Sequence, residues 1–378
     1  MMKFITKKPP IVTNGEHTYK RSLTLHIALI IAALAAIILN GFYTYPVFED
    51  VTPLFNSGLE QSFKVFSMIA IASMIAVVIE LFYSLFEGDT TKFSSYKGFV
   101  DPINTGILIA LLLPINTPIF VLALAVFVGV YIGKLVFGGF GFYIFNPALV
   151  GALFAFSAFG ADHLAQDLVT PLELLKTAIT TNSAFIMSDV WPLLIGNYQS
   201  ISIGSTSVIV LLLLFAYLCV TKVIDLRISG TYLLTVVVMS FGIGGILFGF
   251  GEMALNYVLI NLITGIAVFG AVFFVSETVS TPTSRETKLV YAVTVAILMM
   301  VFRTLSSNVE GLIYAVLFGN MITPFLNRTV KKSNKKALIK TLIGITIAVV
   351  GVTFIIGFML KGQIEESTVS AIMFGGIL

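Results

Sequence analysis

Long apolar runs separated by short polar breaks occupy most of this chain. A run of about 18 or more apolar residues is needed to cross the roughly 30 Å hydrocarbon core of a bilayer, and residues 23–43 and 337–359 are two examples. A soluble protein can bury one such helix in its core, but not a succession of them along its whole length. The pattern therefore predicts an all-α polytopic membrane protein.

The runs predict about 10–11 transmembrane helices. Pro114 and Pro118 interrupt the third and fourth, and interrupted helices are tolerated at membrane depth where protein or a water-lined cavity satisfies the freed backbone groups. The first run lacks a small-residue cleavage site and is expected to be a retained helix rather than a signal peptide. The expected spans are 23–43, 66–85, 104–122, 122–136, 147–160, 206–221, 232–250, 255–275, 289–303, 311–326 and 339–360.

A short internal similarity suggests an inverted repeat. Residues 104–107 read Asn-Thr-Gly-Ile and residues 263–266 read Ile-Thr-Gly-Ile. Segments broken in corresponding halves of a transporter-like fold indicate a binding site at the repeat interface. A chance match of two short motifs is the alternative interpretation.

Charge sets the predicted orientation in a cell membrane. Hydrophobic residues make up 57% of the chain and charged residues only 11%, against roughly 25% charged in soluble domains. The basic tail 1–22 and the basic loop before the last span are expected in the cytoplasm. An acidic loop, 160–205, is then exported, and so is the C-terminus. The predicted regions are this tail, a membrane domain over 23–328, and an extra helix with a short tail over 329–378.

Several kinds of chemistry find no support in the sequence. Cys219 is the only cysteine, and His17, His26 and His163 are scattered, so a haem, metal or iron–sulfur site within the chain is not expected. We recognise no nucleotide-binding loop, and no nucleic-acid partner is expected. Any redox cofactor should be organic.

Residues 134–148 form the first candidate binding segment. Gly138, Gly139 and Gly141 would let the backbone approach a flat or bulky ligand. Asn146-Pro147 resembles a helix start, with a capping residue followed by the favoured first-turn proline. A tight turn between helices is the alternative interpretation.

Residues 276–285 form the second candidate segment. Hydroxyl side chains dominate it, together with one carboxylate and Arg285, so it could surround a polar ligand or an ion at the cytoplasmic side. A solvated loop is the alternative. The candidate residues here are Ser276, Glu277, Thr281 and Thr283.

Four blocks, in this order, resemble signature segments of the RnfD and NqrB subunits of ion-translocating oxidoreductases. The resemblance covers roughly residues 95–328, and the last predicted span lies beyond it. The blocks are Lys134-Leu135-Val136-Phe137-Gly138-Gly139 through Asn146-Pro147-Ala148, Val223-Ile224-Asp225-Leu226-Arg227-Ile228, Phe273-Phe274-Val275-Ser276-Glu277-Thr278-Val279-Ser280-Thr281-Pro282-Thr283, and Glu310-Gly311 followed by Asn320-Met321-Ile322-Thr323-Pro324.

The resemblance implies a ten-helix flavoprotein that passes electrons through bound FMN or riboflavin within a multisubunit complex. The expected partners are the bilayer and other membrane and exported flavoprotein subunits, and the chain needs no complete catalytic site of its own. The residues expected to bind the cofactor are Lys134, Gly138, Gly139, Gly141, Asn146, Pro147, Ser276, Glu277, Thr281 and Thr283.

Thr170 corresponds to the threonine that carries FMN through a phosphodiester bond in this family. The following Pro171 and Leu172 match the family motif, whereas residues 167–169 read Asp-Leu-Val where the family has Ser-Gly-Ala. Covalent FMN at Thr170 and an ordinary helix-capping threonine both remain open. Residues 203–207 similarly resemble an Ile-Gly-Glu-Thr-Ser block of the family, with Ser205 in place of the acid.

Three acidic residues near the cytoplasmic ends of spans have competing interpretations. Glu80 could snorkel to the interface or take part in ion coupling. Asp101 and Asp225, beside Lys97 and Arg227, are expected in loop salt bridges.

Two other functions remain open: a secondary transporter or channel for a small solute, and a redox-inactive structural subunit. The extra span is expected to be a simple anchor, and a docking point for an exported partner is the alternative.

Overall fold

The structure is a computed structural model of the 378-residue chain. It describes residues 15–42, 58–88, 93, 96–160, 164, 191–196, 202–263, 266–305, 311–329 and 335–375. Helices and helical turns account for all of the regular structure within these ranges, which confirms the all-α prediction.

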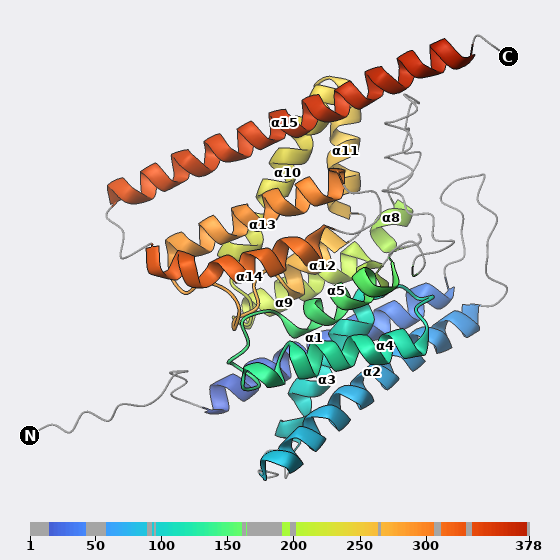
Figure 1. The fold of residues 1–378 in the computed structure, drawn as a ribbon, viewed down its shortest axis with the longest axis vertical. Coiled ribbons are helices and arrows are strands. Elements are labelled where there is room, and N and C mark those ends of the chain that lie inside the picture. Colours follow the sequence, from blue (N-terminus) through green and yellow to red (C-terminus); the bar gives the residue numbers. More distant parts are fainter. Residues whose placement is uncertain are drawn as a thin grey trace, which may run out of the picture.

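Each of the eleven predicted apolar segments corresponds to a helical segment, and the helices pack as a bundle (Figure 1). Their bounds are α1 Gly15–Phe42, α2 Gly58–Glu87, α3 Lys97–Leu112, α4 Ile119–Phe127, α5 Pro147–Phe159, α8 Trp191–Ile195, α9 Val208–Val220, α10 Leu226–Phe248, α11 Glu252–Ile263, α12 Ile266–Phe273, α13 Arg285–Leu305, α14 Leu312–Thr329 and α15 Lys335–Gly375.

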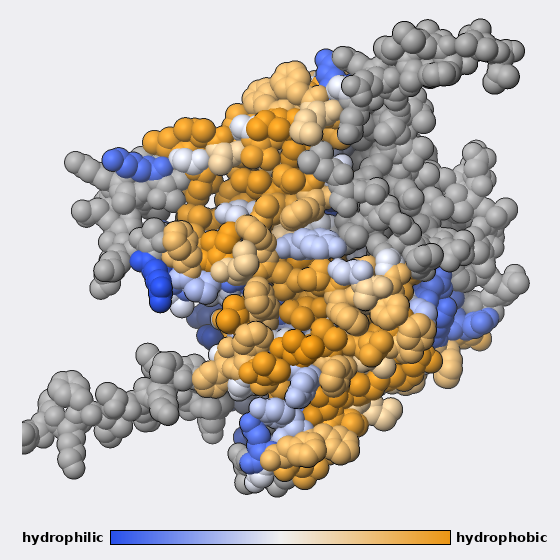
Figure 2. Space-filling view, viewed as in Figure 1, coloured by the Kyte–Doolittle hydropathy of each residue, from blue (hydrophilic) through white to orange (hydrophobic). Residues whose placement is uncertain are grey.

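Among the described residues, six helices are long and apolar enough to cross a membrane alone, or seven if α11 and α12 form one bent span. Shorter apolar helices such as α5 and α9 complete the bundle. Figure 2 shows apolar residues covering the sides of the helices, with hydrophilic residues gathered toward their ends. This distribution is the one expected of a chain surrounded by lipid, so the protein is a multi-pass membrane protein.

The chain breaks its helices where prolines were expected to interrupt them. α3 ends at Leu112, and α4 begins after Pro118 and continues as a π-helical turn, Val128–Ile132. The main-chain N–H of Ile203 donates to the carbonyl of Leu113 at 3.2 Å, so protein satisfies this freed backbone group. The predicted boundary at residue 122 was therefore wrong, because the break lies at residues 113–118.

A second break separates α11 from α12, whose axes differ by 49°. Residues 264 and 265, which carry the second copy of the short internal motif, lie outside the described residues. The first copy, at 104–107, lies inside α3 rather than at a break. The inverted repeat therefore stays a prediction.

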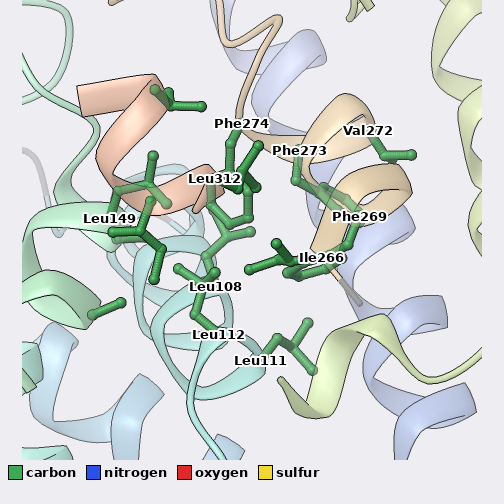
Figure 3. Packing of buried hydrophobic residues seen from close by; sticks show 14 of the residues in the cluster. Leu108, Leu111, Leu112, Leu149, Ile266, Phe269, Val272, Phe273, Phe274 and Leu312 are labelled. Atoms are coloured by element: carbon green, nitrogen blue, oxygen red, sulfur yellow. The ribbon is translucent and has the colours of Figure 1, made fainter. Parts of the chain in front are cut away.

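The centre of the bundle is an apolar layer where both halves of the chain meet. α3 and α5 come from the first half, and α12 and α14 from the second (Figure 3). The buried side chains labelled there are Leu108, Leu111, Leu112, Leu149, Ile266, Phe269, Val272, Phe273, Phe274 and Leu312. This layer fixes the relative position of the loops that leave its helices.

The end of the loop predicted to be exported is part of this core. Ser202 and residues 203–207 are all buried, and a short 3₁₀ turn, Ile203–Ser205, packs against α3 and α12. A Cβ atom at Gly204 would lie 2.6 Å from the ring of Phe269. Only glycine fits this close approach.

The helix α15 lies on the outside of the bundle, against α10 and α13 (Figure 1). Its buried residues Val349, Thr353, Ile356 and Leu360 recur at helical spacing on one face. With 41 residues it is about 61 Å long, roughly twice the thickness of a hydrocarbon core.

Candidate functional site

The loop between the α4 segment and α5 is a left-handed turn that ends in a capped helix. Gly138, Gly139 and Gly141 have φ values of +105°, +84° and +90°, which a side chain would strain. The turn interpretation thus accounts for the three glycines without a ligand. Asn146 caps α5 as predicted: its Oδ1 accepts from the N–H groups of Ala148 at 2.9 Å and Leu149 at 3.3 Å, with Pro147 in the first turn.

The two candidate segments meet at Glu277. Tyr143 donates its hydroxyl to Glu277 Oε1 at 2.5 Å, and Asn146 Nδ2 donates to Oε2 at 2.9 Å. Ser280 Oγ donates to the same Oε2 at 2.8 Å, and Thr281 Oγ1 donates to the main-chain carbonyl of Glu277 at 2.6 Å. Residues more than 130 positions apart therefore form one polar cluster.

Part of the second segment is enclosed rather than solvated. Ser276, Ser280 and Thr281 are buried, so the solvated-loop interpretation was wrong for them. Thr283 is exposed, and its main-chain N–H donates to Asn327 Oδ1 at 3.3 Å. The structure therefore places Thr283 outside the cluster around Glu277.

Lys134 is fully buried and forms ion pairs with Glu80 of α2 and Asp101 of α3. Glu80 is only 1% exposed, so the expectation that it snorkels was wrong: its carboxylate is held inside the bundle by the lysine ammonium. Asp101 lies within α3 and pairs with Lys134, instead of serving only a loop salt bridge beside Lys97. The pairing accounts for how these charges are tolerated away from water.

Asp225 does form a salt bridge, but with a residue that the sequence did not indicate. Lys288 of α13 contacts Asp225 Oδ2 at 2.7 Å, and Asp225 Oδ1 accepts from the main-chain N–H of Arg227 at 3.0 Å. Burial alone would raise the pKa of Asp225, but these hydrogen bonds and positive charges hold it below its ordinary value. The pair joins the start of α10 to α13.

Two fully buried polar atoms near the cluster have no hydrogen-bond partner among the described residues: Ser276 Oγ and Asn320 Nδ2. Asn320 Oδ1 accepts from the Tyr291 hydroxyl at 3.1 Å, which leaves its Nδ2 as the open donor. Tyr291 interacts electrostatically with Glu277, so α13 and α14 contribute to the same region. Buried donors without a partner are uncommon and point to a bound water or ligand.

A histidine network was not anticipated from the sequence. His26 of α1 is buried, and its Nδ1 lies 2.6 Å from Asn104 Oδ1 while its Nε2 lies 3.1 Å from the Tyr96 hydroxyl. Asn104 Nδ2 donates to the Ser22 carbonyl. This network joins α1 to the start of α3, and a polar residue inside an apolar run was its only signal in the sequence.

Two residues singled out in the sequence cannot be placed. Thr170 and Glu310 lie outside the described residues. Among the described residues, no three His, Cys, Asp or Glu side chains come together as a metal site.

The fold is an all-α bundle that contains buried ion pairs, and a polar cluster joins its two halves. These features are typical of a polytopic membrane protein with functional charged residues among its helices. The profile of the NQR2, RnfD, RnfE family matches residues 5–336. The chain therefore belongs to this family, and the match extends beyond residues 95–328, which carry the signature blocks. The helix α15 lies almost entirely outside it.

Three relatives illustrate the family. The chain is 29% identical over 242 residues to the NqrB-type subunit of a Na(+)-translocating NADH-quinone reductase of Pseudomonas aeruginosa, an alignment that covers 61% of this chain and 60% of the relative. It is 29% identical over 225 residues to the RnfD-type subunit of an ion-translocating oxidoreductase complex of Methanosarcina acetivorans, covering 59% of this chain and 68% of the relative.

The third relative is the corresponding subunit of a Na(+)-translocating ferredoxin:NAD(+) oxidoreductase complex of Acetobacterium woodii, 27% identical over 237 residues, covering 60% of this chain and 70% of the relative. The chain thus spans about 60% of the length of the Pseudomonas protein.

Proposed function

We propose that this chain is a membrane-embedded electron-transfer subunit of an ion-translocating oxidoreductase complex, and that it carries a flavin where its two candidate segments meet. The observation that carries the proposal is the contact of Tyr143 and Asn146 with Glu277, because it joins two segments that resemble signature blocks of the family. Family membership supports the same interpretation, and the three relatives are named as subunits of such complexes.

The residues of this region fit a flavin. The ring system of a flavin presents carbonyl oxygens and ring nitrogens, and a protein tunes its potential through hydrogen bonds to them. Ser276 Oγ and Asn320 Nδ2 are buried donors that need an acceptor. When bound, the flavin would accept and pass on electrons, while these side chains would hold and orient it.

The glycines give a poor test, because any residue other than glycine at Gly138, Gly139 or Gly141 would strain the turn whether or not a flavin binds. Ser276→Ala removes one open donor and little else. Ser240→Ala is the matched control, since Ser240 is also fully buried and makes only a long 3.8 Å contact to the sulfur of Met300.

The purified full chain is expected to contain flavin, and Ser276→Ala is expected to bind riboflavin about tenfold more weakly because one hydrogen bond is lost. Ser240→Ala should bind it normally. Titration of flavin fluorescence measures both. Equal affinity in the two variants would remove Ser276 from the site, and a wild-type chain that binds no flavin at all would favour a structural subunit.

Covalent FMN at Thr170 is a separate part of the proposal. Intact-mass measurement should show one FMN adduct on the wild-type chain and none on Thr170→Ala. An unmodified wild-type mass, together with normal riboflavin binding, would show that the exported acceptor motif has lost its function while the inner site persists.

A further inference from the structure

Glu277 differs from the nearby acids Glu80 and Asp101 in the kind of partner it has. Within the described ranges, its three side-chain partners, Tyr143, Asn146 and Ser280, are neutral. The ion pairs in the same part of the chain join Lys134 to Glu80 and Asp101 and leave Glu277 out. Its charge is therefore balanced by dipoles rather than by a counter-charge.

The orientation of Asn146 defines what the site can bind. Its Oδ1 is occupied by the first N–H groups of α5, so its Nδ2 must face Glu277. The amide therefore presents a donor to this site, and a donor repels a metal cation. The other two partners are hydroxyl groups, which can donate to a carboxylate or accept from a carboxylic acid by rotating one bond.

We propose that Glu277 is a proton-binding site. Its carboxyl group takes up a proton on one oxygen and then donates to the hydroxyl that had donated to that oxygen, either Tyr143 or Ser280, while the other hydroxyl keeps donating. The backbone does not have to move. Glu277 is partly exposed and is followed by the exposed Thr278, so its proton can exchange with water at this end of the bundle. The further idea that Glu277 supplies a proton to a bound flavin rests on the proposed function. Proton binding by Glu277 itself does not.

The surroundings of Glu277 favour proton uptake. Burial raises the pKa of its carboxyl group, the three donors lower it, and the negative charge of Asp101 on α3 raises it again, leaving the pKa above the ordinary value for glutamate. The other titratable groups facing this carboxyl are Tyr143, in the loop before α5, and Tyr291 of α13.

Infrared spectroscopy of the purified full-length chain in lipid nanodiscs tests the proposal directly. With isotope-labelled glutamate, lowering the pH should produce the carbonyl band of a protonated glutamic acid, with a midpoint above that of a free glutamate side chain. Glu277→Gln should remove the component of this band that has the raised midpoint, and Glu80→Gln, the matched control, should leave that component. Tyr143→Phe removes a donor to the ionised form and should raise the proton affinity about tenfold.

Other outcomes would overturn the proposal. If the component with the raised midpoint survives in Glu277→Gln, the proton belongs to another residue. If the wild-type chain shows no midpoint above that of free glutamate, Glu277 is an ordinary ionised side chain. A band that disappears when sodium replaces choline at constant pH would make the site a cation site. Flavin content is measured on the same samples, so a failure of the proposed function is seen separately.

Discussion

Lys134 is fully buried between the buried carboxylate of Glu80 and the partly exposed carboxylate of Asp101. Replacing it by methionine keeps most of its volume but leaves the Glu80 and Asp101 charges without their ammonium partner. Breaking a buried pair in this way costs about 3–5 kcal/mol. Lys134→Met is therefore expected to lower the thermal unfolding temperature of the purified protein markedly, as measured by scanning fluorimetry in detergent.

Lys288→Met provides the control for this prediction, because its pair with Asp225 is partly exposed and should contribute about 1 kcal/mol or less. Adding Glu80→Gln and Asp101→Asn to Lys134→Met should restore part of the lost stability, since no buried charge then remains in the group. Unchanged unfolding of Lys134→Met would mean that the ion pairs contribute little.

Individual residues show what the sequence could and could not reveal. The cap at Asn146 was predictable, because a cap is a local hydrogen bond to the next few residues. The partners of Lys134 were not, because they come from two other helices and a position along a helix does not say which neighbour it faces. For the same reason, the sequence could not predict the hydrogen bond between Tyr143 and Glu277.

At the scale of helices, α5 packs closely against α4 and the π-helical turn that continues it, because glycine lies on both sides of this contact: Gly151 in α5 and Gly129 in the turn. A Cβ atom at Gly151 would lie 2.4 Å from the carbonyl oxygen of Ala125, and one at Gly129 would lie 2.6 Å from that of Pro147. Gly151→Ala must push the two backbones apart and is expected to cost about 1–3 kcal/mol, measured by thermal unfolding.

Gly344→Ala in α15 is the matched control for Gly151→Ala, because nothing lies within 4 Å of an added Cβ there. It should be neutral, or stabilising by up to about 1 kcal/mol through helix propensity. An equal loss of stability in both variants would show that the close packing of α4 and α5 is not what Gly151 provides.

Helix positions were predictable to the extent that they depend on local composition. The apolar runs located every long helix, and Pro114 and Pro118 marked a real break. The burial of residues 203–207 was not predictable, since a polar stretch at the end of a loop is expected to be solvated until the helices around it are known. Its serine and threonine hydroxyls bond to nearby backbone carbonyls instead of water.

At the scale of the whole molecule, charge asymmetry predicts that residues 160–205 are exported and that residues 327–338 face the cytoplasm. In a Cys219→Ala background, Asn182→Cys should react with a membrane-impermeant maleimide in intact cells, and Ser333→Cys should react only after the cells are opened. The reverse labelling pattern would invert the topology.

The distance in sequence between Glu277 and its partners has a consequence for biosynthesis. Lys134 meets Glu80 across 54 residues, whereas Asn146 meets Glu277 across 131. At about 5–20 residues per second, the ribosome adds Lys134 about 3–11 s after Glu80. It adds Glu277 only about 7–26 s after Asn146. The first half can therefore neutralise Lys134 while it is being inserted. The loop before α5 stays without this partner for longer, and its polar side chains are a point at which a membrane chaperone could act.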